Sequence, residues 1–364
     1  MKRRIRTILI SAVLALSMSI STFASELTDS FLLSVPKDES ASELTLETAI
    51  EKAISKSSAI KKINLSLSSS DSDRQTLVNE YYASTTDNNI STALALLKYD
   101  MSYSSTLRSK EVQEEQIAYS MTSTFMEIIK AQRSLEVKKK AIETASKEMA
   151  VNKLKEQLGM ISQTELSKLT LTYEDNKTDY EDLEKSLSDA FKDLNTLIGE
   201  SEDSYTIAVL PVYEKLTLET ALDTYISTKM STDPDILDST DSLYIAELNE
   251  DLYDGTSGSY SSVTTSLSQA TLSLSDLKES YTSKLESLYD SIISDEKTYE
   301  ANLKEYELLK TNLTIAEKKY ELGMITKIEL ENARNSVYSE ESSLLSNIYE
   351  HMLLLEKFES PYLG

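Results

Sequence analysis

The chain has 364 residues, of which only four are proline and six are glycine, so it has few turn-forming residues and much room for helix. It contains no cysteine, which excludes disulfides, thiolate metal sites and a cysteine nucleophile. Its formal net charge of −24 at pH 7 disfavours nucleic acid and anionic lipid headgroups as partners.

The N-terminus has the pattern of a secretory signal peptide. Four basic residues within the first six positions precede an apolar run from Ile8 to Ile20, and Thr22 and Ala24 place small side chains at the cleavage site. A transmembrane anchor is the alternative, but the run is too short to span a bilayer comfortably. We assign residues 1–24 to the signal peptide and residues 25–43, which are polar and include Pro36, to a flexible lead-in.

The first half of the remaining chain reads as long helices. A helical pattern begins at Thr45, a residue suited to an N-cap, and continues to about Tyr82. Residues 83–110 alternate briefly, which allows a β-hairpin, but we expect irregular or helical structure. Helix is predicted from Glu111 to Leu158 and again after a reversal at Gly159, with an end at Gly199.

The second half repeats this plan. A helix is expected to start at Leu218 and to be interrupted at Thr232, Asp233 and Pro234. A serine- and threonine-rich run over 254–275 carries only a weak β signal, and a long helix is predicted over 276–322. The final helix, after a reversal at Gly323, has an apolar period near 3.5 residues, which is typical of a left-handed coiled coil.

Two phrases occur twice in the chain. LGMIS at 158–162 returns as LGMIT at 322–326, and LTLETAI at 44–50 returns as LTLETAL at 216–222. Such self-similarity indicates two copies of one structural unit. The predicted organisation is therefore repeat 1 over 44–199, a linker over 200–215 and repeat 2 over 216–364.

The predicted fold is all-α, with two tandem long antiparallel helical hairpins. Each leg of a hairpin would contain roughly 55 residues and extend about 80 Å. Such hairpins are too thin to bury their own apolar flanks, so they must pack on each other and on other subunits. The helix before Gly323 carries two apolar stripes and so needs two neighbours, as in a closed ring; the stripes are Tyr299, Leu303, Tyr306, Leu313 and Tyr320, and Leu308, Ile315 and Leu322.

LTLETA at 44 and 216, LGMIS at 158 and YELGMIT at 320, in this order behind a signal peptide, resemble the TolC family of outer-membrane efflux channels. The resemblance extends from Leu44 to the end of the chain. It implies a homotrimer whose two-repeat protomers form a twelve-helix tunnel for efflux or type I secretion in the cell envelope. It also implies a periplasmic adaptor as partner, driven by an ABC transporter or a proton-driven pump.

The resemblance also implies which residues function at the turns. The docking tips for the adaptor would be Leu158, Gly159, Met160, Ile161, Leu322, Gly323, Met324 and Ile325. By position, Thr164, Glu165 and Tyr320 match gating residues of the family, and Glu329 matches an acidic residue at its aperture. A basic residue of the family's lock would fall at Ile325 and is missing here. The alternatives are that the tips are turn residues packing on themselves and that the two glutamates are solvated residues at helix starts.

A second departure concerns the outer membrane. Each family repeat inserts a β-hairpin between its long helices, and three protomers combine these into a barrel. Membrane strands need about 9–11 residues of alternating polarity, which residues 83–110 and 254–275 do not provide. We therefore expect a TolC-like helical tunnel with a reduced or missing β-barrel. Its location would be the outer membrane if a barrel is present, and otherwise the extracytoplasmic space or cell surface.

No catalytic, cofactor-binding or metal site is expected. His351 is the only histidine and lies on the predicted seam, so we interpret it as a packed residue rather than a base. There is no nucleophile elbow, Gly-rich phosphate loop or histidine cluster. The alternative function is an exported, non-channel coiled-coil scaffold or adaptor of the cell envelope, which would share the helices but not the paired tips.

Overall fold

The computed structural model describes residues 31–34, 41–83, 89–201, 205–207, 209, 211–255 and 258–363. The predicted signal peptide, residues 1–24, lies outside this part of the chain, as does most of the predicted lead-in. The predicted predominantly helical fold is confirmed. In chain order the elements are β1 (Ser42–Glu43), α3 (Leu46–Lys56), α4 (Ser58–Ala83), α5 (Asn89–Gln157), α6 (Gln163–Ile198), β2 (Tyr205–Thr206), α7 (Leu222–Met230), α8 (Pro234–Asp251), α9 (Tyr260–Glu321), α10 (Lys327–Glu359) and η1 (Pro361–Leu363).

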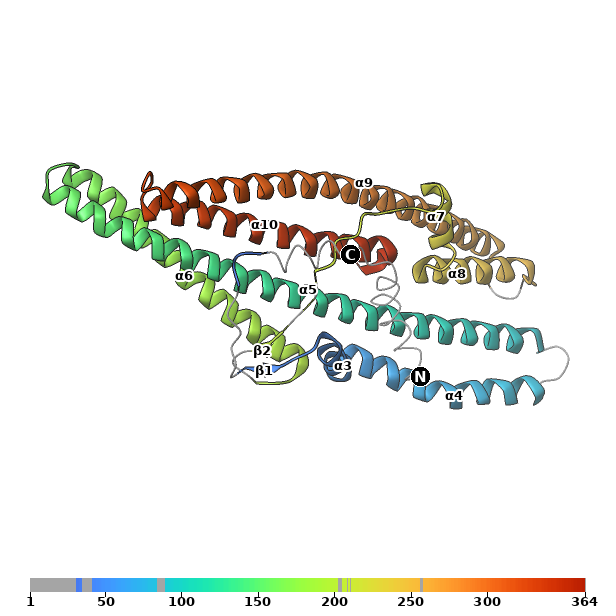
Figure 1. Cartoon of the computed structure of the whole chain (residues 1–364). Helices are drawn as coiled ribbons and strands as arrows, with labels where there is room; N and C mark the ends of the chain where they lie inside the picture. The colour runs from blue at the N-terminus through green and yellow to red at the C-terminus, as the bar shows by residue number, and fades with distance from the viewer. Residues whose placement is uncertain are drawn as a thin grey trace.

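Two long helical hairpins form the body of the molecule (Figure 1). In the first hairpin α3 and α4 pack on α5, which reverses into α6; in the second α7 and α8 pack on α9, which reverses into α10. Because α5 also packs on α10, the long helices lie in the order α6, α5, α10, α9. The predicted pair of tandem antiparallel hairpins is confirmed. With 69 residues, α5 alone extends about 100 Å.

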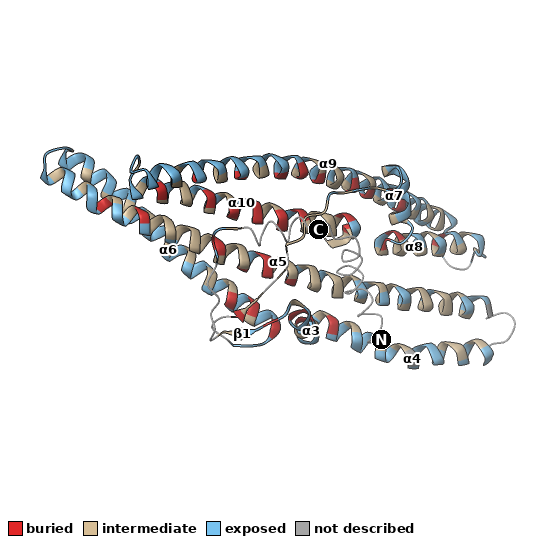
Figure 2. Cartoon of the chain, viewed as in Figure 1, coloured by how far each residue is buried: buried red, intermediate tan, exposed pale blue. Residues whose placement is uncertain are grey.

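Apolar seams hold the helices of each hairpin together, and Figure 2 shows the buried residues concentrated along them. The seam between α9 and α10 contains Tyr306, Val337 and Leu344, all with no exposed surface. The first hairpin is closed in the same way by α3, α5 and α6 around Phe125 and Leu194. This burial is the main source of stability, because the helices have no other way to remove apolar surface from water.

The first hairpin is more open on the turn side of its core. A hollow of about 750 Å³ lies between α5 and α6 and is lined by Tyr173 and Tyr180, among others. When the repeats are aligned on their turn glycines, these tyrosines take the places of Val337 and Leu344, which are fully buried in the second hairpin. The two repeats therefore share a topology and differ in how tightly their seams close.

Helix ends follow the local sequence signals at several predicted positions. The hydroxyl of Thr45 accepts a hydrogen bond from the N–H of Thr48 and caps α3. Gly199 ends α6 in the left-handed conformation, with a φ of 72°. Asp233 caps α8 and Pro234 is its first residue, which confirms the predicted interruption there.

The two LTLETA phrases have different structures. Thr45 caps α3 in the first phrase, whereas residues 216–221 are irregular and α7 begins at Leu222. The predicted helix start at Leu218 is therefore wrong. The N–H of Leu216 instead donates to the buried carboxylate of Glu296, 2.6 Å away, and this tertiary contact competes with local helix formation.

The two segments with weak β signals are mostly helical where the structure describes them, and residues 254, 255, 258 and 259 are irregular. α5 begins at Asn89, within the predicted irregular or helical span 83–110, and α9 begins at Tyr260, within 254–275. A short parallel pair, β1 with β2, accounts for the strands in the described residues. None of the helices in the described ranges is both long and apolar enough to cross a bilayer.

Phe31 to Ser34, within the span expected to be a flexible lead-in, lie against both hairpins. The N–H groups of Leu32 and Leu33 donate to the Glu341 carboxylate at 2.6 and 3.1 Å. Arg133 on α5 contacts the Leu33 carbonyl and forms an ion pair with Glu341 at 2.8 Å. Burial raises the pKa of Glu341 and lowers that of Arg133. A buried ion pair thus joins the first repeat, the second repeat and the segment before them.

Candidate docking site at the helix turns

The two predicted turns have the same backbone structure. In the first, the N–H of Gly159 donates to the carbonyl of Glu156 and that of Met160 to the carbonyl of Lys155, both at 2.8 Å. In the second, the N–H of Gly323 donates to the carbonyl of Tyr320 at 2.9 Å, and the N–H of Met324 donates to the carbonyl of Lys319 at 2.8 Å. This pair of bonds is the Schellman motif, in which a left-handed residue satisfies the last carbonyls of a helix. The φ angles of Gly159 and Gly323 are 71° and 68°.

Substitution of these glycines should cost stability through backbone strain alone. A Cβ at Gly159 or Gly323 would meet no atom within 4 Å, so only the left-handed φ opposes a side chain. We expect Gly323→Ala to lower the free energy of unfolding by about 1–2 kcal/mol. Gly323→Asn should cost less, because asparagine tolerates this conformation. Chemical denaturation followed by circular dichroism measures both variants, and equal losses for alanine and asparagine would contradict the strain argument.

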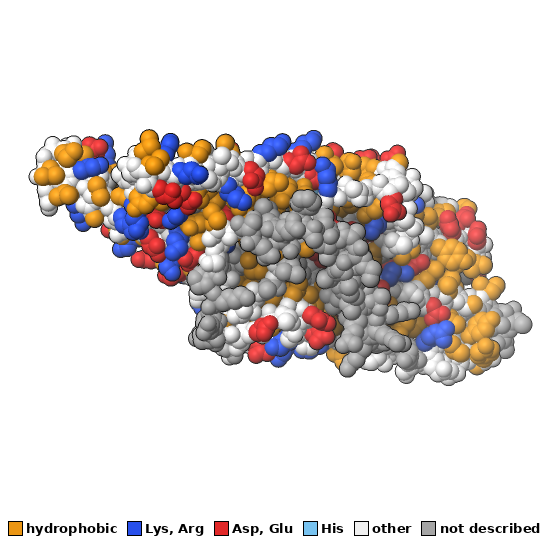
Figure 3. Space-filling view, viewed as in Figure 1, with side chains coloured by type: hydrophobic (Ala, Val, Ile, Leu, Met, Phe, Trp, Pro, Cys, Tyr) orange, Lys and Arg blue, Asp and Glu red, His pale blue; other side chains and the backbone are white. Residues whose placement is uncertain are grey.

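Apolar side chains project from both turns. Leu158 and Met160 are 66% and 68% exposed, and Leu322 and Met324 are 75% and 67% exposed. The hydrophobic side chains at the tip of the first hairpin are visible at the far left of Figure 3. Exposed methionine and leucine are typical of adaptable contact surfaces. The chain thus presents two apolar tips of nearly identical sequence and backbone.

The isoleucines of the turns are less exposed than their neighbours. Ile161 and Ile325 are half-buried, and Ile325 packs against the seam of the second hairpin. They therefore support the turns from inside, while the leucine and methionine positions face outward. The predicted tips divide in this way into outward-facing residues and half-buried residues.

The predicted gating residues lie within about a turn or two of the glycines. Thr164 and Glu165 are exposed in the first turn of α6, and Tyr320 is exposed at the end of α9. Glu329 is exposed too, but its carboxylate accepts the N–H of Thr326 at 2.7 Å and the Thr326 hydroxyl at 2.9 Å. These bonds lower the pKa of Glu329, so its capping of α10 persists until the pH falls through that lowered value.

Sequence reasoning missed the capping residues of both turns. Ser162 accepts the N–H of Glu165 at 3.1 Å and Thr326 accepts that of Glu329 at 3.2 Å. Thr326 and Glu329 form a full capping box. A hydroxyl residue three positions before a glutamate was a readable signal for this arrangement. The glutamates assigned to gating thus also stand at the N3 positions of their helices.

Both turns lie at the same end of the molecule (Figure 1). Behind them, α5 and α10 are joined by side-chain hydrogen bonds. Asn332 donates to Glu148 at 2.7 Å and Asn335 donates to Thr144 at 3.0 Å. Glu148 precedes Gly159 by about three helical turns, so the tips extend beyond this polar junction between the repeats.

Comparison with known proteins identifies the architecture. No family model and no curated protein matches the chain. Solved structures match it along most of its length. CusC, described in connection with transmembrane channel formation, matches with a TM-score of 0.63 and 12% identity, covering 92% of this chain and 96% of CusC. The outer membrane protein VceC of Vibrio cholerae matches with a TM-score of 0.61 and 11% identity, covering 88% of this chain and 96% of VceC. The outer membrane channel CmeC of Campylobacter jejuni matches with a TM-score of 0.60 and 13% identity, covering 91% of this chain and 90% of CmeC.

These matches decide the fold. The chain has the TolC fold. The resemblance indicated by the repeated phrases is thereby confirmed for the architecture, and of the three matched proteins CusC and CmeC are described as channels. At 11–13% identity the comparison concerns the TolC fold as a whole. The assignment of the tip residues depends on the geometry described above.

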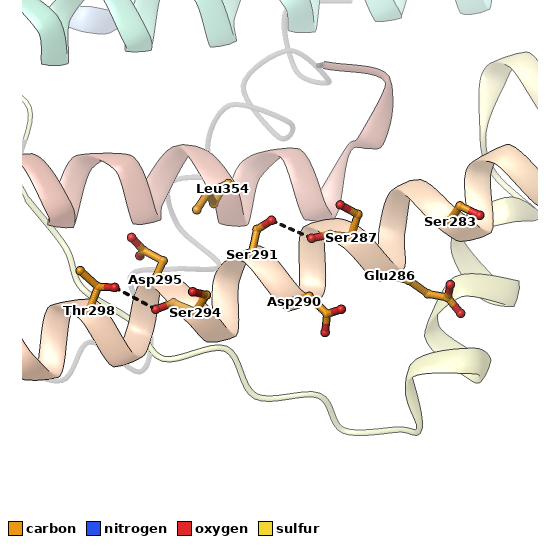
Figure 4. Close-up of a pocket in the computed structure, with 9 residues that line it drawn as sticks. All are labelled: Ser283, Glu286, Ser287, Asp290, Ser291, Ser294, Asp295, Thr298 and Leu354. Atoms are coloured by element: carbon orange, nitrogen blue, oxygen red, sulfur yellow. Dashed lines mark hydrogen bonds between the residues drawn. The ribbon is translucent and has the colours of Figure 1, made fainter.

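A hollow of about 790 Å³ also runs along α9 of this TolC fold, far from the turns (Figure 4). Hydroxyl and carboxylate side chains line most of it. The Ser291 and Thr298 hydroxyls are already bonded to carbonyls of their own helix, at 2.7 and 3.1 Å. Among the described residues no three His, Asp or Glu side chains are grouped to hold a metal ion.

Proposed function

We propose that the chain is the protomer of a trimeric helical duct of the cell envelope, which serves efflux or type I secretion and binds an adaptor through its helix turns. The observation that carries this proposal is the pair of equivalent turns at one end of the molecule, each presenting exposed leucine and methionine. An ABC transporter or a proton-driven pump would supply the energy. Two matched turns per protomer would give a trimer six similar docking positions.

The order of the long helices supports ring closure. α6 and α9 are the outer helices of the row α6, α5, α10, α9. Leu308 and Ile315, which belong to the second apolar stripe of α9, are exposed, and so is Leu171 on α6. Packing α9 of one protomer against α6 of the next would bury these residues in a head-to-tail contact, which closes into a ring when repeated.

Docking is tested by making the tips polar without changing the turns. In the native host, with the chromosomal copy deleted, we expect Met160→Ser/Met324→Ser to abolish efflux of a reporter dye while the protein is still made. The matched control is Leu65→Ser/Leu272→Ser, which removes two other exposed leucines, 70% and 62% accessible, on α4 and α9. Leu272 is about 75 Å from Gly323 along α9. Equal efflux by the tip variant and the parent would contradict docking.

The oligomeric state separates a duct from a scaffold. Light scattering of the purified protein should give the mass of three chains, and electron microscopy should show a central lumen. Leu308→Glu/Ile315→Glu should reduce the mass to that of one chain by placing charges in the proposed contact. A stable monomer or dimer of the parent would favour the coiled-coil scaffold instead.

A further inference from the structure

The chain's single histidine lies between three segments. His351 on α10 has no exposed surface. Its Nδ1 lies 2.9 Å from Oδ2 of Asp295 on α9, and its Nε2 lies 2.7 Å from the carbonyl oxygen of Glu214, in the irregular chain before α7. A carboxylate and a carbonyl both accept hydrogen bonds. The doubly protonated ring can therefore donate to both, whereas the neutral ring has only one N–H to offer.

The carbonyl bound by His351 belongs to the irregular stretch that precedes α7, residues 211–221, here called the inter-repeat linker. It crosses the second hairpin before α7 (Figure 1). The Tyr213 ring stacks on Tyr299 of α9 at 3.7 Å between centroids and lies 4.8 Å from the His351 ring. Lys215 adds an ion pair with Glu300 at 3.0 Å. His351 thus lies at the centre of the contact that holds this linker.

Two buried polar atoms of the linker have no hydrogen-bond partner among the described residues in its docked position. Within the described residues, the hydroxyl of Tyr213 and Oε1 of Glu214 are buried without a hydrogen-bond partner. Burial raises the pKa of both groups above their ordinary values. Undocking would return both atoms to water, which opposes the contacts that hold the linker in place. The loss of one further hydrogen bond can therefore shift the balance toward release.

The first repeat shows that a hairpin of this fold does not need a polar pair at the positions of Asp295 and His351. When the repeats are aligned on Gly159 and Gly323, the places of Asp295 and His351 are taken by Ala131 and Leu187. Leu187 packs against the core of the first hairpin. The fold thus accepts an apolar pair here, and the aspartate–histidine pair is a feature of the second repeat alone.

Solvent protons have a route to the buried ring. Asp295 lines the hollow along α9 together with Glu286 and Asp290. Figure 4 shows Asp295 pointing toward α10, at the edge of that hollow. Its side chain is 14% exposed, whereas that of His351 is fully buried. The carboxylate therefore connects the histidine to water.

We propose that His351 is a proton-dependent clamp, which fixes the inter-repeat linker to the second hairpin when doubly protonated and loosens it when neutral. The charged and titratable groups around the ring are Asp295, Glu296 and Tyr299 on α9 and Tyr213, Glu214 and Lys215 on the linker. On α10 itself, burial raises the pKa of Glu356 to about 7. Glu356 therefore changes charge near neutral pH and must be present in every variant compared.

Hydrogen exchange of the full chain tests the clamp. Exchange of peptides from residues 211–221 is compared at pH 6 and pH 8 after correction for intrinsic rates. We expect linker protection to fall about tenfold at pH 8, as for the loss of one hydrogen bond to a charged group. Asp295→Ala/His351→Leu, which installs the pair of the first repeat, should give protection that does not depend on pH. An equal pH effect in both proteins, or none in the parent, would overturn the proposal.

A second measurement uses the fact that the chain has one histidine. The ring nitrogens, labelled with 15N, report directly on its protonation, and their titration should coincide with the loss of linker protection. Asp295→Asn keeps the shape but removes the carboxylate, so the midpoint of both transitions should move to lower pH. A midpoint that does not move, or a ring that titrates without a change in linker exchange, would show that His351 only fills space.

Discussion

Glu341→Ala is expected to lower the free energy of unfolding by about 3–5 kcal/mol, because it leaves a buried charge without its partner. The Glu341 carboxylate is fully buried and accepts hydrogen bonds from Arg133 and from the N–H groups of Leu32 and Leu33. Its removal leaves the Arg133 guanidinium, on a side chain only 7% exposed, facing a cavity. Urea denaturation followed by circular dichroism gives the difference from the parent.

Two controls separate the charge from the cavity. Arg133→Met/Glu341→Leu replaces the pair with apolar side chains of similar size and should lose clearly less than Glu341→Ala. Lys192→Ala removes one partner of an exposed pair, in which Lys192 lies 2.8 Å from Asp189, and should leave stability unchanged within error. If the apolar pair were as unstable as the alanine variant, the loss would come from packing rather than from the unpaired charge.

Leu344→Ala should cost about 2–5 kcal/mol, which is the usual range for a leucine removed from a closed core. Leu344 has no exposed surface and packs in the seam with Tyr306, Val337 and Ile348. Long helices with narrow seams cannot collapse around a missing side chain without separating along their length. The loss should therefore appear in the denaturation midpoint of the whole chain.

The first repeat supplies a matched control for this variant. Tyr180 takes the place of Leu344 when the repeats are aligned on their turn glycines, but it is half-buried beside a hollow. We expect Tyr180→Ala to cost only about 1–2 kcal/mol, although a larger side chain is removed, because less of it is withdrawn from water. A larger loss for Tyr180→Ala than for Leu344→Ala would contradict the open seam of the first hairpin.

Features set by local chemistry were predictable from the sequence. The left-handed turns at Gly159 and Gly323, the cap at Thr45 and the stop at Gly199 depend on residues within one helical turn. The repeated phrases then fixed the tandem hairpins, and their resemblance to a known family indicated the architecture. The tips were expected to expose methionine and isoleucine; the methionines are exposed, but the isoleucines are half-buried and the leucines are exposed instead.

Features set by distant contacts were not predictable in this way. The second LTLETA phrase has the same helix-start signal as the first, but the contact of Leu216 with Glu296 keeps it irregular. Nothing in the local sequence indicated that Leu32 and Leu33 bind Glu341, more than 300 positions along the chain. Identical local signals therefore gave different structures where long-range polar contacts intervened.

α5 has a mechanical consequence for any partner bound at the tips. It is one unbroken helix of 69 residues that packs on α3, α4, α6, α8 and α10. A push on the first turn cannot be absorbed by a hinge in this helix, because the rod has no joint between its two ends. The load must travel the length of the rod to the opposite end of the molecule, so both ends are expected to shift as one lever.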